Sequence, residues 1–503
     1  MNQGQRKLAV VVEDYPYSTG EPFFHAELKK LVQEFDEIAI VCKHAATRKK
    51  NPPDFALPAG VRLFELNGKA SFRTKLRTAI KVFLGGRWIS IWRDIRRTGV
   101  PFNAYTFKVA LAYIEASERM EKELRSVWEG NRANWIWYSY WCDDAAYMLA
   151  RWQKNGEIGR SLCRVHNTDV YMERHPYAYL PFRKFIHENL SQVLPISAHA
   201  QRYLWNQTPR ASSRILLSRL GVPVQPDLAP PERRTPRLLS LSKISPVKNI
   251  EGLIEALWHW DGEELEWHHF GQAPKSEYGA AILRKMEALA VQNPRVRVVA
   301  HGFVPPADMM QRIRELNPTA LINTSLFEGI PVSMMEVASL GIPVLGPQIC
   351  GVPELVVDGV SGFLLQPEDP QSIRRAIQEL LSLSPEDYLE LRRGSREIQH
   401  RFFQDEVNYA RLGAQLQGQE FLDCRNESEP TDIGIVSVGT GNIDVWLQLF
   451  RDEGLSAKAL SRAEQVESCR ALVLPGVGHF DAAMSRLNEP ELKAALNRHH
   501  ASK

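Results

Sequence analysis

Several features that would mark a membrane protein, a metalloprotein or a nucleic-acid-binding protein are missing from this chain of 503 residues. No apolar run is long enough to span a bilayer, and the run at 8–12 is too short for a signal peptide, so it predicts a first buried strand. The six cysteines, at positions 42, 142, 163, 350, 424 and 469, lack metal-ligand spacing and fit a reducing cytoplasm. A net charge of +3 is small for this length, so no nucleic-acid partner is expected.

Short apolar runs alternate with longer helical patterns along most of the chain. This alternation is typical of parallel sheets with helices on both faces. The runs predict strands at 8–12, 38–42, 135–138, 162–164 and 192–196, and then at 238–241, 265–270, 296–300, 320–323 and 344–346. The proline-rich, charged stretch 222–237 predicts a linker between the two series. We therefore expect an α/β protein with two Rossmann-like domains facing a cleft, the second finished by helices at 385–417.

The segment Leu326-Phe-Glu-Gly-Ile-Pro-Val-Ser-Met-Met-Glu336 carries the most functional information. If Gly329, Ile330 and Pro331 open a helix after a strand, proline fits the first turn and the free N–H groups form an anion site. Glu328 then lies just before the helix, and Glu336 about a turn and a half into it. A nucleotide sugar, with hydroxyls on both sides of a diphosphate, would suit this arrangement. Two solvated glutamates, one of them favoured by the helix dipole, are the alternative for the bare pair.

This segment and its continuation, Gly346-Pro-Gln-Ile-Cys-Gly-Val-Pro-Glu-Leu-Val-Val-Asp-Gly-Val-Ser-Gly-Phe-Leu-Leu365, resemble the signature of family 4 retaining glycosyltransferases of the GT-B fold. The resemblance implies an acceptor-side domain at 1–228 and a nucleotide-sugar-binding domain at 229–420. It implies transfer of a sugar from a nucleoside-diphosphate sugar to an acceptor hydroxyl in bacterial cell-surface polysaccharide synthesis, whether lipopolysaccharide, O-antigen or capsule. A nucleotide-sugar epimerase and a noncatalytic nucleotide-sugar-binding or scaffold protein are the alternatives.

The same resemblance assigns roles to residues in other segments. Lys243 and Lys248 stand where the family places Arg and Lys against the donor diphosphate, and Lys at the first position keeps the charge but loses bidentate geometry. His166, in Arg164-Val-His-Asn-Thr-Asp169, is expected near the sugar and the diphosphate. The predicted catalytic set is Lys243, Lys248, His166 and Glu328, and the predicted donor-binding set is Glu336, Gly329, Ile330, Pro331, Gly20 and Glu21.

No metal or other cofactor is expected. The chain has no Asp-x-Asp motif before a suitable strand, since Asp143 and Asp144 are adjacent. Fixed positive groups and helix N–H donors would instead stabilise the charge that builds on the leaving phosphate. The resemblance implies front-face attack by the acceptor hydroxyl, whose proton passes to the diphosphate.

The stretch 69–97 combines positive charge with aromatic residues. It contains one acid, Asp94, against the basic residues Lys69, Arg73, Lys75, Arg77, Lys81, Arg87, Arg93, Arg96 and Arg97, with Phe72, Phe83, Trp88 and Trp92 between them. Such a segment could lie on an anionic membrane surface, on the cytoplasmic face of the inner membrane beside a lipid-linked saccharide acceptor. A solvated helix with buried aromatic residues is the alternative.

A further segment follows a linker at 421–431. The runs Ile433-Gly-Ile-Val-Ser-Val-Gly-Thr-Gly-Asn442 and Ala471-Leu-Val-Leu-Pro-Gly-Val-Gly-His-Phe-Asp481 resemble the beginning of the glutamine amidotransferase subunit of imidazole glycerol phosphate synthase. Ser437-Val438 replaces the family's Asp-Tyr, and Gly476 would fall in the oxyanion-hole strand. Because no cysteine elbow or later His-Glu pair follows, we expect that 432–503 does not hydrolyse glutamine. A relic of gene fusion, a frameshift and a docking module are the alternatives.

Overall fold

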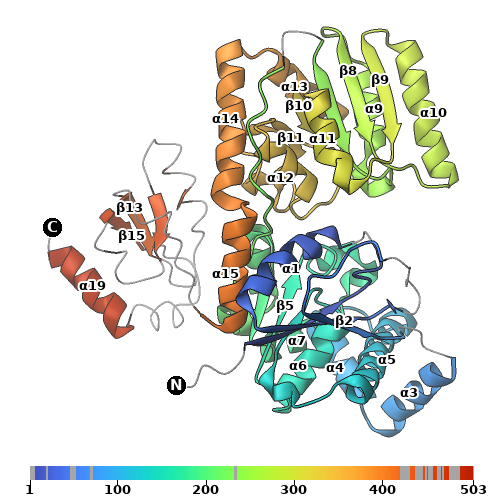
Figure 1. Ribbon diagram of the computed structural model, residues 1–503, viewed down its shortest axis with the longest axis vertical. Coiled ribbons are helices and arrows are strands. Elements are labelled where there is room, and N and C mark those ends of the chain that lie inside the picture. The colour runs from blue at the N-terminus through green and yellow to red at the C-terminus, as the bar shows by residue number, and fades with distance from the viewer. Residues whose placement is uncertain are drawn as a thin grey trace. The chain divides into compact units, whose positions relative to one another are not determined.

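The computed structural model divides the chain into two compact units, Met1–Phe421 and Leu422–Lys503 (Figure 1). In the larger unit it describes residues 6–18, 21–45, 53–67, 72–231 and 235–419. In the smaller unit it describes residues 431–436, 446–447, 450, 457–460, 466, 469–474 and 488–501. Within these ranges no helix combines the length and the apolar character that crossing a membrane requires.

The first half of the larger unit is built on a six-stranded sheet whose neighbouring strands run parallel, in the order β3-β2-β1-β4-β5-β6. Its strands are β1 (Lys7–Val12), β2 (Glu37–Cys42), β3 (Val61–Glu65), β4 (Ile136–Ser139), β5 (Arg160–Val165) and β6 (Gln192–Pro195). All but β3 were predicted. β3 escaped prediction because it is an edge strand with only partly buried or exposed residues, so it has no continuous apolar run.

Helices cover both faces of this sheet. Alternate residues of β1 enter two different cores, with Ala9 and Val11 in one and Leu8, Val10 and Val12 in the other. The helices are α1 (Pro22–Glu34), α3 (Phe72–Leu84), α4 (Trp88–Thr98), α5 (Ala104–Val127), α6 (Asp144–Lys154), α7 (Arg183–Asn189) and α8 (Ala198–Gln207). Short 3-10 turns lie at Arg132–Asn134, Met172–Arg174, Pro176–Ala178 and Pro209–Arg214.

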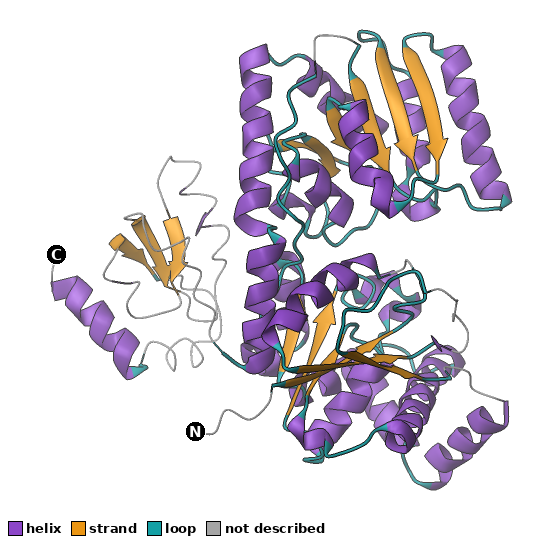
Figure 2. Cartoon of the chain, in the orientation of Figure 1, coloured by secondary structure: helices purple, strands orange, loops and turns teal. Residues whose placement is uncertain are grey.

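The second half repeats the plan of a sheet with helices packed on it (Figure 2). Its sheet has the order β12-β11-β10-β7-β8-β9. Its strands are β7 (Arg237–Leu241), β8 (Leu265–Phe270), β9 (Val296–Gly302), β10 (Ala320–Ile322), β11 (Val344–Pro347) and the unpredicted edge strand β12 (Gly362–Leu365). Its helices are α9 (Ile250–Trp258), α10 (Glu277–Gln292), α11 (Pro306–Leu316), α12 (Val332–Ser339), α13 (Pro370–Leu381) and α14 (Pro385–Phe402), with 3-10 turns η5 (Pro246–Lys248) and η6 (Val352–Glu354).

One helix departs from the expectation that 385–417 finishes the second half. α15 (Asp405–Gln417) packs on α1, and its apolar residues Tyr409, Leu412 and Leu416 join a core of the first half. Arg160 fixes its end by donating to the carbonyl of Leu416 at 2.6 Å. The chain thus returns to the first half because α15 has an apolar face that matches the uncovered face of that sheet.

The smaller unit has a three-stranded sheet of parallel neighbours in the order β14-β13-β15. Its described elements are β13 (Thr431–Val436), β14 (Ala457–Leu460), β15 (Cys469–Val473) and α19 (Pro490–Ala501). The strand predicted at 433–438 is found as far as Val436. Ser437, Val438 and Gly476, which carry part of the amidotransferase resemblance, lie outside the described residues.

Candidate active site

The strand order of each large sheet reverses at one place, between β1 and β4 in the first and between β7 and β10 in the second. In open parallel sheets, ligands bind beyond the carboxyl ends of the strands at such a point. A small polar cavity lies there in the second half, lined in part by Ser242 after β7, by Lys248, and by Asn323, Thr324 and Ser325 after β10. The site expected from the sheet topology therefore lies at the loops after β7 and β10, which contain or precede the predicted residues Lys243, Lys248 and Glu328.

An ion pair between Lys248 and Glu328 forms the centre of this site. Ser325 Oγ donates to the same Oε1 of Glu328 at 2.8 Å. Thr324 Oγ1 holds the opposite loop by donating to the carbonyl of Asn249 at 3.0 Å. Glu328 is only 8% exposed, whereas Lys248 remains partly open to solvent. The fold thus joins a predicted cation and a predicted carboxylate from segments far apart in the sequence.

Helix α12 follows Glu328 after three residues. It begins at Val332, so Pro331 is its N-cap residue and not part of its first turn as predicted. Ile330 is buried beneath the loop. The first N–H groups of a helix have no partner inside it, and the predicted anion site at this end stays a prediction.

Glu336 lies on α12 beyond its first turn. Burial raises the pKa of its carboxyl group to about 7. It forms no ion pair with any residue that the structure describes. A carboxylate held in this way gains hydrogen bonds if hydroxyl groups of a ligand reach it.

Gly329 brings the two halves of the larger unit close together. A Cβ atom at this position would lie 3.0 Å from the carbonyl oxygen of His166. Nearby, Glu354 accepts from the amides of Ala198 at 3.0 Å and His199 at 2.9 Å, at the start of α8. Arg219 donates to the same carboxylate at 2.7 Å. No role was predicted for Glu354, because its partners come from the other half of the unit.

His166 follows β5 and is almost fully buried. The centroid of its ring lies 4.2 Å from that of Trp141, and neither ring nitrogen has a hydrogen-bond partner among the described residues. Burial lowers its pKa, so the ring is neutral at pH 7 and carries one donor and one acceptor. Asp169 Oδ2 lies 3.8 Å from Nδ1, beyond hydrogen-bond range. The unsatisfied nitrogens favour the predicted ligand contact.

The remaining predicted cation, Lys243, is exposed and forms no ion pair with the described residues. It follows β7 at the carboxyl edge of the second sheet. Gly271 faces the same loop, where a Cβ atom would lie only 1.7 Å from the carbonyl oxygen of Ser242. This close approach requires glycine, a constraint that the sequence pattern did not reveal.

Comparison with known proteins agrees with this geometry. Residues 229–397 match the family model described as glycosyl transferases group 1. The chain carries a group 1 glycosyltransferase domain.

Curated relatives match different parts of the chain. The amylovoran biosynthesis glycosyltransferase AmsK of Erwinia amylovora is 28% identical over 150 residues, which cover 29% of this chain and 35% of the relative. The colanic acid biosynthesis glycosyltransferase WcaL of Escherichia coli K12 is 25% identical over 282 residues, which cover 52% of this chain and 66% of WcaL. The imidazole glycerol phosphate synthase subunit HisH of Prochlorococcus marinus is 40% identical over 62 residues, which cover 12% of this chain and 29% of HisH. The chain thus spans about a third of AmsK and HisH and 66% of WcaL.

Solved structures confirm the expected GT-B fold. The lipopolysaccharide outer core galactosyltransferase WaaB in its apo form superposes with a TM-score of 0.57 at 15% identity, covering 82% of this chain and 99% of WaaB. Anabaena HepE in complex with UDP-glucose superposes with a TM-score of 0.51 at 15% identity, covering 82% of this chain and 99% of HepE. At this identity the likeness shows the fold alone.

Of the donor-binding candidates in the first half of the larger unit, Gly20 lies outside the described residues. Glu21 is buried and accepts from the amides of Asp14 at 3.0 Å and Tyr15 at 2.9 Å. Trp141 Nε1 donates to it at 2.7 Å. These donors already occupy the carboxylate of Glu21, so the structure gives it the task of shaping the loop after β1. Its predicted donor contact stays a prediction.

The adjacent acids Asp143 and Asp144 bind a buried cation of the protein. Lys43, at the end of β2, pairs with Asp143 and lies 2.6 Å from Asp144. Burial, together with the neighbouring Asp144, raises the pKa of Asp143 to about 7, although Lys43 opposes this shift. No group of three metal-ligating side chains occurs in the described ranges. Metal independence stays a prediction.

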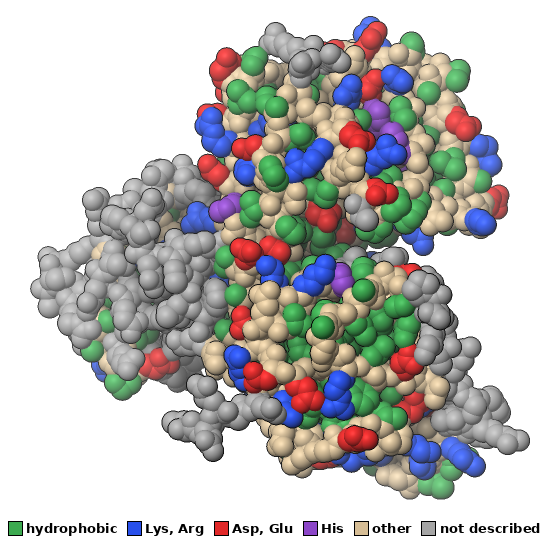
Figure 3. Space-filling model, viewed as in Figure 1, with side chains coloured by type: hydrophobic (Ala, Val, Ile, Leu, Met, Phe, Trp, Pro, Cys, Tyr) green, Lys and Arg blue, Asp and Glu red, His purple; other side chains and the backbone are tan. Residues whose placement is uncertain are grey.

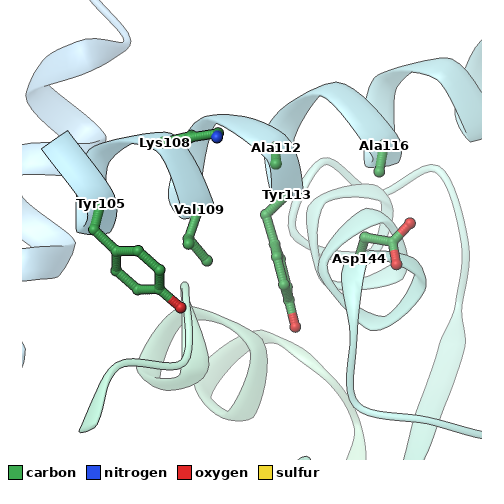
Figure 4. A pocket seen from close by; sticks show the side chains of 7 residues that line it. All are labelled: Tyr105, Lys108, Val109, Ala112, Tyr113, Ala116 and Asp144. Atoms are coloured by element: carbon green, nitrogen blue, oxygen red, sulfur yellow. The ribbon is translucent and has the colours of Figure 1, made fainter. Parts of the chain in front are cut away.

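A groove runs along α5 beside these acids (Figure 4). Tyr105, Val109 and Tyr113 point from one face of the helix into it, and Asp144 closes one end. Tyr113 accepts a hydrogen bond of 3.4 Å from Arg183. None of these residues was predicted as part of the site, because their helical spacing is equally typical of a buried face.

Proposed function

We propose that the protein is a retaining glycosyltransferase that moves a sugar from a nucleoside-diphosphate sugar to an acceptor hydroxyl in bacterial cell-surface polysaccharide synthesis. The observation that carries this proposal is the Lys248–Glu328 pair at the switch point of the second sheet, directly before the N-terminus of α12. A cation, a carboxylate and free helix N–H groups are what a charged diphosphate with a hydroxylated sugar needs.

The chemical step requires stabilisation of a leaving diphosphate. As the bond from the anomeric carbon to the diphosphate oxygen breaks, negative charge builds on that oxygen. Lys243, Lys248 and the N–H groups at the start of α12 oppose this charge with groups already in place. The acceptor hydroxyl attacks from the same face, and its proton passes to the departing diphosphate, so the configuration is retained.

Three polar side chains would orient the donor. Glu328 accepts from sugar hydroxyls, and its bond from Ser325 keeps it in position. His166 donates to an oxygen of the sugar or the diphosphate through one of its unsatisfied ring nitrogens. Glu336 accepts from the ribose hydroxyls, which favour its ionised form and lower its raised pKa on binding.

For the acceptor we propose a lipid-linked saccharide at the cytoplasmic face of the inner membrane. The α5 groove is our candidate for its sugar residues, because Tyr105 and Tyr113 offer apolar ring faces and Asp144 offers an acceptor for hydroxyls. The polysaccharide and lipopolysaccharide enzymes among the relatives support this acceptor class. We keep the predicted domain limits, 1–228 and 229–420, as part of the proposal, with the exception of α15, which packs on the first half.

A mass-spectrometric screen of nucleotide-sugar consumption, with and without lipid-linked sugars, tests the function. UDP-glucose is the first donor to try, because the HepE structure contains it. We expect acceptor-dependent consumption by the wild type and a severe loss in Lys248→Ala. Lys285→Ala is the matched control, since it breaks another Lys–Glu pair, with Glu251, on the exposed surface of α10. Donor converted to an isomer without acceptor would indicate an epimerase, and full activity in Lys248→Ala would refute the assignment.

A further inference from the structure

Helices α3 and α4 carry large apolar side chains on the outside of the protein. Leu84 is 84% exposed and Phe83 is 61% exposed, whereas side chains of these types are usually buried. We call the exposed set on these helices the basic apolar surface; it consists of Ile80, Phe83, Leu84, Trp88, Ile89 and Trp92, with the cations Arg77, Lys81, Arg93, Arg96 and Arg97. Figure 3 shows basic and apolar side chains together at its lower right, where Figure 1 places α3.

The inward faces of the same helices explain why these side chains are outside. α3 turns Thr78 and Val82, one helical turn apart, toward the protein. α4 turns Ile91, Asp94 and Ile95 inward. Each helix therefore already has a packed side, and Phe83, Trp88 and Trp92 are exposed. The alternative of a solvated helix with buried aromatics does not fit Phe83, Trp88 or Trp92.

The charged side chains of the basic apolar surface are all positive. Asp94, the sole acid between positions 77 and 98, is buried and accepts from Tyr179 Oη at 2.8 Å and from the amide of Phe182 at 2.9 Å. Arg87 pairs with Glu118 of α5, so we exclude it from the set. The guanidinium of Arg96 lies 5.1 Å from the ring centroid of Trp92, which places a cation beside an exposed aromatic ring.

We propose that the basic apolar surface binds a bilayer that contains anionic lipids. The aliphatic and aromatic side chains would enter the boundary between headgroups and acyl chains, while the cations contact phosphate groups. Leu84, Ile80 and Ile89 have no π face, which favours a lipid surface over single-stranded nucleic acid. The charge pattern complements anionic headgroups and requires no particular protein sequence.

The surface continues toward the α5 groove. Phe83 contacts Phe107, and Phe107 contacts Phe102, which is 52% exposed just before α5. Tyr105, which lines the groove, follows within the first turn of that helix. A membrane bound at the basic apolar surface would therefore lie beside one end of the groove. This binding does not depend on the proposed transferase activity.

Vesicle sedimentation tests the proposal with the full chain. Vesicles of phosphatidylcholine alone are compared with vesicles that also contain phosphatidylglycerol, at low and high salt. We expect binding that requires the anionic lipid and weakens with salt, since each basic residue near such a surface changes partitioning roughly five-fold. The triple variant Lys81→Gln, Arg93→Gln, Arg96→Gln should then lower the partition coefficient on the order of 100-fold.

Two further variants distinguish insertion from simple charge attraction. Phe83→Ser with Leu84→Ser should weaken binding at constant charge, whereas the exposed pair Arg210→Gln and Val291→Ser, far from α3 in the sequence, should leave it unchanged. Thermal unfolding verifies that each variant is folded, and light scattering without vesicles reports self-association. Equal binding to neutral and anionic vesicles, or wild-type binding by the triple variant, would overturn the proposal, as would a dimer that the Ser variants abolish.

Discussion

Replacing Glu336 by glutamine should stabilise the protein and weaken its binding of nucleotide, and the two effects have one physical origin. Burial holds the pKa of this carboxyl group at about 7, above its ordinary value of 4.5. A group whose pKa is raised by folding contributes its full stability at low pH and loses it as the pH rises from 4.5 to about 7. Above that pH the folded wild type carries a poorly solvated charge that glutamine removes.

The size of the effect follows from the same shift. One pKa unit corresponds to about 1.36 kcal/mol, so the difference from 4.5 to about 7 gives about 3 kcal/mol, which partial exposure reduces to roughly 2 kcal/mol. For one half of the larger unit, roughly 2 kcal/mol corresponds to about 4–8 °C in Tm. We therefore expect Glu336→Gln to melt at about the wild-type temperature near pH 5 and several degrees higher near pH 8.5.

Thermal unfolding across this pH range, followed by fluorescence, measures the difference directly. Glu397→Gln, an exposed glutamate on α14 of the same half, is the matched control and should melt like the wild type at every pH. Calorimetric titration with UDP should show a loss of roughly 10- to 100-fold in affinity for Glu336→Gln, because hydrogen bonds to charged groups contribute about 1.5–3 kcal/mol. A Tm difference that does not change with pH would refute the reasoning.

Three other variants test the rest of the site. Lys248→Ala should slow turnover by roughly 100-fold with a smaller change in KM, because the cation acts mainly on the charge of the leaving group, and steady-state kinetics with equal kcat for both proteins would contradict this. Asp169→Asn should destabilise the protein by about 2 kcal/mol at pH 7. Burial raises the pKa of Asp169, but Arg183 and the backbone amide of His166, which donates to Asp169 Oδ1 at 2.7 Å, outweigh burial and hold this pKa at about 2. Since that stability is present above pH 3.8 and lost as the pH falls through 2, the Tm difference should disappear in strong acid. Removal of all residues after Arg425 should leave sugar transfer intact if the smaller unit is a relic, whereas a loss of activity in a folded protein would favour a docking role.

Most of the strands could be predicted because buried parallel strands have continuous apolar runs. The edge strand β3 could not, since none of its residues is buried and it has no continuous apolar run. β12 was missed as well, although three of its four residues are buried. α15 has an ordinary amphipathic pattern, and a pattern says that a helix has an apolar face without saying which sheet covers it.

For the site, the sequence alone determined the residue types and the order of the loops. Lys248 was predicted from the resemblance to the glycosyltransferase family, and Glu328 from its place before an expected helix start together with the same resemblance. The sequence also determined that 69–97 is basic and aromatic, since composition needs no fold.

Only the tertiary structure decided which of these groups meet and which face solvent. In the folded chain Lys248 pairs with Glu328, and Glu21 accepts hydrogen bonds from backbone amides. Asp94 is buried, whereas Leu84 is exposed. The physical reason is that burial and pairing depend on which elements pack together over long separations in the chain. Local sequence fixes the chemistry of a side chain, and packing alone sets its environment.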